Sequence, residues 1–211
     1  MSLRIRGIYA VAAVSTAGVI AHSVRRGKTA GFDARITTAI QRRSNPAFVA
    51  TMRTASWAGF PPQSRILPLA IPSAIALLAD RVDALFQLLA WGTSGISGAI
   101  KFLMRRPRPH PDRFTVAPAR IGGTSFPSGH VINYTGVYGF LAFLASQRIE
   151  APWLRRSVVG CLSALIALVG PSRIYLGHHW FTDVVTSYLL GSTYVLALIT
   201  LYQRLQRRGI V

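Results

Sequence analysis

The segment SRIYLGHHWFTD, residues 172–183, joins two long apolar runs at 157–174 and 184–202. A helix needs roughly 20 mainly apolar residues to cross the hydrocarbon core of a bilayer, and each run comes near that length. Because a bilayer offers no water to free backbone groups, an apolar segment that spans it on its own is a helix. The stretch therefore predicts two membrane helices joined at one end by a polar, charge-bearing connection.

Four further segments are similarly apolar, at 7–23, 64–79, 84–104 and 131–146. Of the 211 residues, 51% are apolar and 14% are charged, and the mean hydropathy is +0.37, whereas about a quarter of the residues of a soluble domain are charged. The first segment follows Arg4 and Arg6 in the manner of a signal peptide, but the later runs favour a retained span. Pro68 and Pro72 interrupt the second, and membrane helices tolerate proline. We predict an all-α integral membrane fold with six transmembrane helices in one domain, residues 1–211.

The polar stretch at 25–63 separates the first two predicted spans. Within it, apolar residues recur at helical spacing beside arginines: Phe32, Ile36, Ala39 and Ile40 next to Arg35, Arg42 and Arg43. That pattern is typical of a helix lying in the membrane interface. The alternative is a solvated helix packed on the domain.

The charge balance indicates an anionic partner. Lys and Arg number 24 against 6 acidic residues, which gives a formal net charge of +18. A nucleic-acid-binding domain carries its basic residues along a solvated face, whereas here they gather between apolar runs. Anionic head groups attract basic segments beside membrane spans, so we expect membrane lipids and a lipid phosphate as partners, and no nucleic acid.

Polar residues gather at three predicted helix ends, the first being KFLMRRPRP, residues 101–109. Lys101 lies near the end of the third span, and Arg108 follows just past a helix that Pro107 and Pro109 would end. The two cations can therefore turn toward one point. The alternative is that they are interfacial anchors.

The second cluster is SFPSGH, residues 125–130, directly before the fourth apolar run. Pro127 suits a first helical turn, Ser128 can cap or donate, and Gly129 lets a ligand approach the backbone. The free N–H groups of a helix start bind anions, and His130 would sit one turn in, placed to pass a proton. The alternative is an ordinary capped helix with an incidental histidine.

The third cluster is the opening segment itself. Arg173 offers a planar cationic fork that matches phosphate oxygens. His179 and Asp183 are four residues apart, so they share a face if the sixth helix begins around them, and the carboxylate can then hold one ring nitrogen while the other faces a substrate. The alternative is that the histidine and the aspartate act only as helix caps. Because the chain carries two other basic clusters, this alternative is less favoured.

These segments resemble the three-part signature of the type 2 phosphatidic acid phosphatase superfamily, which also includes vanadium haloperoxidases. The signature reads K-x6-R-P, then P-S-G-H, then S-R-x5-H-x3-D, and every fixed position is present: Lys101, Arg108, Pro109, residues 127–130, Ser172, Arg173, His179 and Asp183. The motif-bearing core covers about 84–205. One departure is Ser187, where many relatives carry glycine, and we expect it to alter helix packing and not chemistry.

The resemblance implies roles for the matched residues. His179 would attack phosphorus, Asp183 would orient it, and His130 would protonate the leaving oxygen and later activate water. Phosphate oxygens would be held by Lys101, Arg108, Arg173, Ser128 and the amide of Gly129. His178 has no assigned role and is expected at an interface or behind the site. No metal and no other cofactor is expected, since no two of the six acidic residues form a helix-spaced pair near the site histidines.

The predicted function is hydrolysis of a lipid-linked phosphate or diphosphate: polyprenyl diphosphate, phosphatidic acid or phosphatidylglycerol phosphate. One alternative is a phosphatase for polyprenyl-phosphoryl sugars acting at the cytoplasmic face. Two more are a vanadate-dependent haloperoxidase, against which the apolar spans argue, and a non-catalytic protein that binds anionic lipids.

The distribution of charge alone does not decide on which side of the membrane the site lies. Six spans put the motif residues on one face and both termini on the other. With Lys101, Arg108 and Arg173 set aside, Lys and Arg number 12 on the motif face and 9 on the other, an excess too small for the positive-inside rule to decide. The resemblance favours an extracytoplasmic site in the cell membrane.

Overall fold

The computed structural model describes residues 2–118 and 122–209, and in these ranges every regular element is a helix. The elements in chain order are α1 (Leu3–Arg25), α2 (Ala30–Gln41), α3 (Pro46–Ala55), the short 3₁₀ helix η1 (Trp57–Gly59), α4 (Gln63–Leu78), α5 (Arg81–Leu89), the 3₁₀ helix η2 (Ala90–Gly92), α6 (Thr93–Met104), α7 (Gly129–Arg148), α8 (Pro152–Tyr175) and α9 (Phe181–Arg207). The all-α prediction is confirmed for the described residues.

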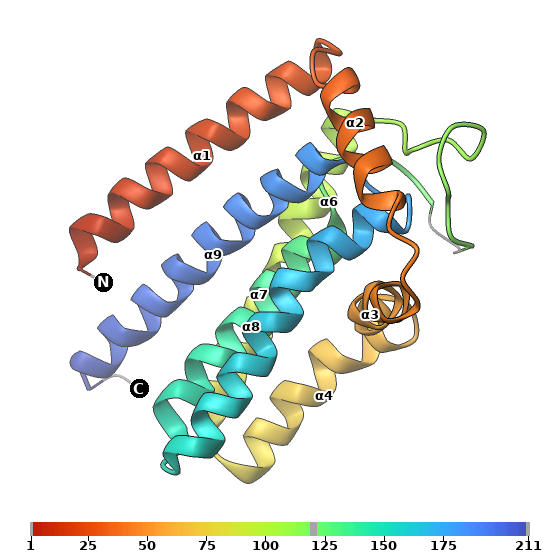
Figure 1. Cartoon of the computed structure of the whole chain (residues 1–211). Coiled ribbons are helices and arrows are strands. Elements are labelled where there is room, and N and C mark those ends of the chain that lie inside the picture. Colours follow the sequence, from red (N-terminus) through yellow and green to blue (C-terminus); the bar gives the residue numbers. More distant parts are fainter. Residues whose placement is uncertain (1, 119–121, 210–211) are drawn as a thin grey trace.

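The long helices form a bundle in which α7 packs against both α8 and α9, and α1 lies along the outer side of α9 (Figure 1). Both termini lie at one end of the bundle, and the long segment between α6 and α7 lies at the other, near α2 (Figure 1). The polar connection between α8 and α9 is also at that second end. All three polar clusters of the sequence thus meet at one end of the bundle.

Two apolar clusters hold the bundle together. One joins the site-proximal part of α7 to the end of α8 and the start of α9, through Val131, Tyr134, Val137, Tyr138, Val169, Ile174 and Val184. The other joins α5 and η2 to the far part of α7 and to α9, through Phe86, Ala90, Phe140, Leu144, Leu198 and Tyr202. At that far end the buried carboxylate of Asp83 accepts hydrogen bonds from Arg148 and from Tyr202, which ties α5, α7 and α9 together.

Within residues 2–118 and 122–209, three helices are long and apolar enough to cross a membrane: α1, α8 and α9. Large apolar side chains are exposed along the outside of the bundle, among them Val11 on α1, Leu77 on α4 and Phe102 on α6, exposed by 70%, 85% and 76%. An exposed apolar surface of this extent suits contact with lipid tails. The structure has the character of a membrane protein, and the arrangement of six spans stays a prediction.

The predicted span at 84–104 is helical throughout, with the 3₁₀ turn η2 between α5 and α6. The hydroxyl of Tyr194 donates to the carbonyl oxygen of Leu89 at 2.7 Å, which occupies an acceptor of the helix. Gly92 leaves room for this ring, since a β-carbon there would lie 2.3 Å from the Tyr194 hydroxyl. The tighter 3₁₀ turn follows from this contact with α9.

The polar stretch between the first two predicted spans forms two helices, α2 and α3, where one interfacial helix was predicted. Asn45 caps α3 by accepting from the backbone N–H groups of Ala47 and Phe48. The α2 helix contacts α8 and α9 and buries Asp33 and Thr37 completely. This contact matches the alternative of a helix packed on the domain, and a position in the interface stays a prediction.

Candidate active site

His179 is held at its Nδ1 atom by a backbone carbonyl. Nδ1 lies 2.8 Å from the carbonyl oxygen of Ser125 and 3.5 Å from Oδ2 of Asp183. The other ring nitrogen, Nε2, lies 3.2 Å from Nη1 of Arg108. The ring is 2% exposed, so its orientation is set entirely by these neighbours and by packing.

These partners assign the tautomer of His179. A carbonyl oxygen only accepts, so Nδ1 carries the proton, and a guanidinium only donates, so Nε2 carries the lone pair. Burial, followed by the positive charges of Arg173 and Arg108, lowers the pKa of His179 well below its ordinary value of 6.5. The ring is therefore neutral, with a nucleophilic nitrogen pointing at Arg108.

The geometry of His179 and Asp183 differs from the predicted shared helix face. Helix α9 begins at Phe181, so His179 precedes it, and Asp183 is in its first turn. Oδ2 of Asp183 accepts from the backbone N–H of Trp180 at 2.9 Å and so caps the helix start. The carboxylate reaches the ring across this start, and the carbonyl oxygen of Ser125 is the nearer acceptor.

Arg106 links Asp183 to α2. Its Nη1 atom donates to Oδ1 of Asp183 and its Nη2 atom to Oδ2 of Asp33, both at 2.6 Å. Asp33 also accepts from the backbone N–H and the hydroxyl of Thr182, each at 2.9 Å. Both carboxylates are fully buried, so this cation between two anions fixes α2 and the Arg106 loop on the start of α9.

Several polar atoms of the motif residues lie buried with no hydrogen-bond partner among the described residues. They are Nε, Nη1 and Nη2 of Arg173, Nε of Arg108, Oγ of Ser128 and Nε2 of His130. Arg173 is 0% exposed, and its guanidinium stacks over the Phe60 ring at 4.9 Å. Buried polar groups are paired in almost all proteins, so a cluster of unpaired donors is the mark of a site for an anion.

Lys101 and Arg108 converge on one carbonyl. Nζ of Lys101 donates to the carbonyl oxygen of Thr124 at 2.8 Å, and Nη2 of Arg108 donates to the same oxygen at 3.2 Å. Nη1 of Arg108 also donates to the carbonyl oxygen of His178 at 2.7 Å. A carbonyl is a weaker partner than a phosphate oxygen, so both cations can exchange these contacts for an anionic ligand.

The start of α7 follows the predicted pattern in part. Ser128 occupies the N-cap position without a side-chain capping bond, which leaves its hydroxyl for a ligand. His130 is the second residue of the helix, whereas the sequence predicted it one turn into the helix. The backbone N–H of Ser128 donates to Oγ of Ser187 at 2.8 Å. Ser187, the departure from the family pattern, therefore ties the start of α7 to α9, as expected of a packing change.

His130 is enclosed by a turn of backbone. A β-carbon on Gly59 would lie 2.1 Å from Cδ2 of His130, so η1 passes directly against the imidazole. The Phe60 ring meets the same imidazole edge-on, with centroids 4.8 Å apart, and meets His178 in the same way at 6.0 Å. Glycine at position 59 is required for this close approach.

His178 lies behind the site, in agreement with its expected position. Its Nε2 atom donates to the carbonyl oxygen of Ala117 at 2.8 Å, and its Nδ1 atom is buried with no partner among the described residues. Burial, and then the charge of Arg173, lower the pKa of His178 to about 4, so this ring is neutral as well.

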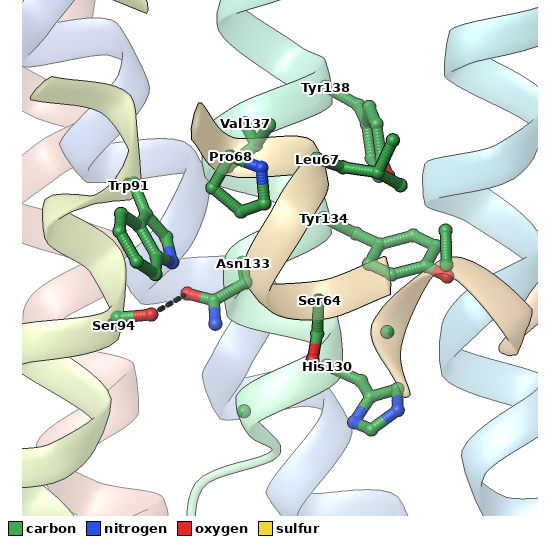
Figure 2. A pocket seen from close by; sticks show the side chains of 13 residues that line it. Ser64, Leu67, Pro68, Trp91, Ser94, His130, Asn133, Tyr134, Val137 and Tyr138 are labelled. Atoms are coloured by element: carbon green, nitrogen blue, oxygen red, sulfur yellow. Dashed lines mark hydrogen bonds between the residues drawn. The ribbon is translucent and has the colours of Figure 1, made fainter. Parts of the chain in front are cut away.

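A cavity of about 310 Å³ opens beside His130 between η1, α4, α6 and α7 (Figure 2). Its polar lining includes Ser64, Ser94 and Asn133, and its apolar lining includes Leu67, Pro68, Trp91 and Val137. The volume falls in the range of small-molecule sites.

Sequence patterns did not predict the Arg106–Asp33 ion pair, the carbonyl oxygen of Ser125 as a hydrogen-bond acceptor, or the contacts of Gly59 and Phe60 with the His130 ring. Arg106 occupies a variable position of the first motif, and its partner Asp33 is 73 residues away in the chain. One signal was present: Asp33 is the only acidic residue before position 80. The segment between Arg105 and Thr124, which joins the first two motifs, includes residues 119–121, which lie outside the described residues.

No three His, Cys, Asp or Glu side chains among the described residues gather into a group able to hold a metal ion. The donors that surround the proposed anion site are instead arginine, lysine, hydroxyl and imidazole groups.

Comparison with known proteins gives a family, a similar sequence and solved structures of the same fold. The model of the PAP2 superfamily matches residues 83–207. Phosphatidylglycerophosphatase B of Bacillus subtilis (strain 168) is 35% identical over 112 residues, and the match spans only 52% of this chain and 53% of that protein. The crystal structure of the first transmembrane PAP2 type phosphatidylglycerolphosphate phosphatase from Bacillus subtilis has a TM-score of 0.78 at 24% identity, over 92% of this chain and 96% of the other. That of Aquifex aeolicus LpxE has a TM-score of 0.62 at 17% identity, over 79% and 93%. The two structures share the fold of this chain.

Proposed function

Because this chain belongs to the PAP2 superfamily, we propose that it is a membrane phosphatase that hydrolyses a lipid-linked phosphate through a phosphohistidine on His179. The observation that carries the proposal is the convergence of unpaired buried donors from Arg108, Ser128, His130 and Arg173 beside the Nε2 lone pair of His179. A phosphate group supplies the acceptor oxygens that these donors lack.

The first step is transfer of the phosphoryl group to His179. Its Nε2 lone pair forms a bond to phosphorus while the bond from phosphorus to the leaving oxygen breaks, and His130 gives that oxygen a proton. Lys101, Arg108, Arg173, Ser128 and the amide of Gly129 hold the phosphate oxygens, whose charge they stabilise. Nδ1 stays protonated and donates to Ser125, while Asp183 stabilises the positive charge that the ring gains.

The second step is hydrolysis. His130, now neutral, takes a proton from water as the water oxygen attacks phosphorus, and the bond between phosphorus and Nε2 of His179 breaks. Inorganic phosphate leaves and the lone pair returns to His179. His130 ends protonated, ready for the next substrate, so protons and charges balance over the cycle.

The membrane arrangement supports access for a lipid. We place the site at an end of six spans, formed by α1, α4, α5 with α6, α7, α8 and α9, and on the extracytoplasmic side of the cell membrane. On α4, Ile66 and Leu69 are exposed beside Leu67 and Pro68, which line the cavity next to His130, so a lipid substrate can reach it with its tails still among membrane lipids.

The test is phosphate release by the purified protein, with a chelator present, from polyprenyl diphosphate, phosphatidic acid, phosphatidylglycerol phosphate and a polyprenyl-phosphoryl sugar. We expect release by the unmodified chain and none above background by His179→Ala. His22→Ala is the matched control, since His22 is an exposed residue of α1 that belongs to none of the three motifs and does not line the cavity. Equal release by His179→Ala refutes the mechanism, and loss of release with the chelator refutes its independence of metal.

A further inference from the structure

A basic cavity lies between α1 and α9, at the end of the bundle where both termini lie (Figure 1). Its volume is about 300 Å³, at the lower end of the range of small-molecule sites. Three arginines line it, Arg6 of α1 with Arg204 and Arg207 of α9, together with Thr200 and Gln203. The motif residues lie at the opposite end of the bundle, so this cavity is separate from the proposed catalytic site.

The basic cavity has no acidic side chain to balance its arginines. Asp33 is the first acidic residue of the chain and Asp183 is the last, so α1 carries none and neither does α9 beyond its first turn. No carboxylate of residues 2–118 or 122–209 forms an ion pair with any of the three arginines. Cations gathered around one cavity repel one another unless an anion lies between them. The charge of the cavity therefore indicates an anionic ligand.

Arg6 is held in place with one buried donor unpaired. Its Nη1 atom donates to Oγ1 of Thr200 and to Oε1 of Gln203, each at 2.9 Å, which fixes the guanidinium against α9. Its Nε atom is buried and has no hydrogen-bond partner among the described residues. A buried N–H group without an acceptor is costly, and a phosphate oxygen is a strong acceptor for a guanidinium. The side chain of Arg6 is thus already oriented by the protein and lacks an acceptor that a phosphate would supply.

An apolar groove of about 350 Å³ continues from the basic cavity between the same two helices. The cavity and the groove share Leu3, Arg6 and Arg204 among their lining residues, and the groove continues past Gly7 and Leu196. Gly7 keeps the groove open, because nothing lies within 4 Å of a β-carbon at that position. A cationic cavity joined to an apolar groove matches a phosphate head group joined to a hydrocarbon chain.

We propose that the α1–α9 seam binds an anionic phospholipid, whose phosphate lies among Arg6, Arg204 and Arg207 and one of whose acyl chains lies in the groove. A free phosphate ion carries the same kind of charge but has no chain to fill the groove, so the site is assigned to a lipid. Helix α1 has Ala13 and Ala17 as its buried residues, and the bound lipid bridges α1 to α9 and stabilises their contact.

The test measures, by microscale thermophoresis, the binding of dioctanoyl phosphatidylglycerol and dioctanoyl phosphatidylcholine to the full chain in detergent micelles. Inorganic phosphate is present throughout, so that a phosphate ion fills the proposed catalytic site. We expect the anionic lipid to bind at least about fivefold more tightly than the zwitterionic one. The double variant Arg204→Gln, Arg207→Gln should weaken binding of phosphatidylglycerol by about tenfold or more, since each arginine beside an anionic lipid contributes about fivefold.

The double variant Arg4→Gln, Arg208→Gln is the matched control. Both arginines are exposed at the same two helix ends, and their loss removes the same charge, but neither lines the cavity or the groove. Its affinity for phosphatidylglycerol should stay within about twofold of that of the unmodified chain. Both double variants should keep the helical circular dichroism of the unmodified chain in lipid-free micelles, because the four substituted side chains are exposed.

Gly7→Leu tests the groove without changing the charge. The new side chain occupies the groove and should weaken binding of phosphatidylglycerol, whereas Gly18→Leu, at an exposed position of α1 outside the groove, should not. Equal affinity for the two lipids, or an equal loss in the two arginine pairs, overturns the proposal. So does displacement of the lipid as inorganic phosphate is raised at constant ionic strength. These outcomes concern binding alone and leave the phosphatase proposal untouched.

Discussion

Nδ1 of His179 donates to the carbonyl oxygen of Ser125 at 2.8 Å, which joins the proposed nucleophile to the segment that carries Ser128 and His130. The bond fixes the tautomer with the lone pair on Nε2, because a carbonyl oxygen cannot donate. Ser125 itself is anchored, since its backbone N–H donates to the carbonyl oxygen of Arg106 at 2.8 Å. Nucleophile, acid and first motif are thus joined through the backbone.

This bond and the burial of the ring predict how His179 titrates. An ordinary histidine takes up a proton at about pH 6.5, whereas burial lowers the pKa of His179 well below that value, so its ring should stay neutral through the pH range in which an ordinary histidine titrates. In ¹⁵N spectra of histidine-labelled protein in detergent, the His179 resonances, identified by their loss in His179→Gln, should keep the pattern of the Nδ1-protonated neutral tautomer throughout. A protonated ring or the opposite tautomer at pH 7 contradicts the account of the nucleophile.

Arg106 is expected to position Asp183 through Oδ1, the carboxylate oxygen other than the one that faces His179. Arg106→Gln leaves the buried carboxylates of Asp33 and Asp183 without a counter-charge, which destabilises a protein by about 3–5 kcal/mol when a buried pair is broken. The measurements are thermal unfolding in detergent and kcat, both of which should fall. Adding Asp33→Asn removes one of the two stranded charges, so the double variant should be more stable than Arg106→Gln alone.

The neighbouring Arg105→Ala serves as the control for Arg106, because Arg105 is exposed. It should leave kcat within about twofold. If Asp33→Asn lowers the stability of Arg106→Gln further, as two independent losses would, the ion pairs of Arg106 with Asp33 and Asp183 do not stabilise the protein as proposed.

Gly59 is expected to be necessary for the acid and base role of His130. In Gly59→Ala the new β-carbon would meet the His130 ring at 2.1 Å, so the imidazole or η1 must move, and kcat should fall by at least about tenfold. Gly95→Ala is the matched control, since nothing lies within 4 Å of a β-carbon there, and its activity should be unchanged. Full activity of Gly59→Ala would show that His130 is not held where the proton transfer needs it.

The side of the membrane is open to a labelling test. Cys161 is the only cysteine, so Cys161→Ser gives a background free of thiols. Asp112→Cys then marks the site end, where the Asp112 side chain is 81% exposed, and Glu150→Cys marks the opposite end. In spheroplasts a membrane-impermeant maleimide should label the first variant and should label the second only after lysis. The reverse pattern places the site in the cytoplasm.

The apolar runs of the sequence predicted the long helices well, because a run of some 20 apolar residues has few alternatives in a membrane. They did not predict the 3₁₀ turn before α6, where the hydroxyl of Tyr194, 105 residues away in the chain, donates to the carbonyl oxygen of Leu89. Contacts between distant segments have no local signature in the chain.

The motif spacings predicted that the three polar clusters would meet, and all three do lie at one end of the bundle. The local geometry of the site differs in places from the prediction. His179 and Asp183 were expected to share a helix face if the sixth helix began around them, whereas α9 starts at Phe181, with Asp183 capping it through the backbone N–H of Trp180. The pairing of Arg106 with Asp33 was not foreseen, since helical periodicity says which face a residue lies on and not which distant charge it meets. The roles assigned to the motif residues stay proposals, and the experiments above test them.

The most direct test of the central claim is to trap the phosphoryl group on the protein. His130→Asn removes the base of the second step, and a substrate with a good leaving group, such as 4-nitrophenyl phosphate labelled in its phosphate, needs no acid in the first step. Rapid quenching of this variant with that substrate should therefore retain label on the chain. The account predicts an acid-labile, base-stable phosphoramidate, located by fragmentation mass spectrometry on His179 and not on His178, and absent from the His130→Asn, His179→Ala double variant. Phosphate release by the unmodified chain without label on His179 in any quenched sample would contradict it.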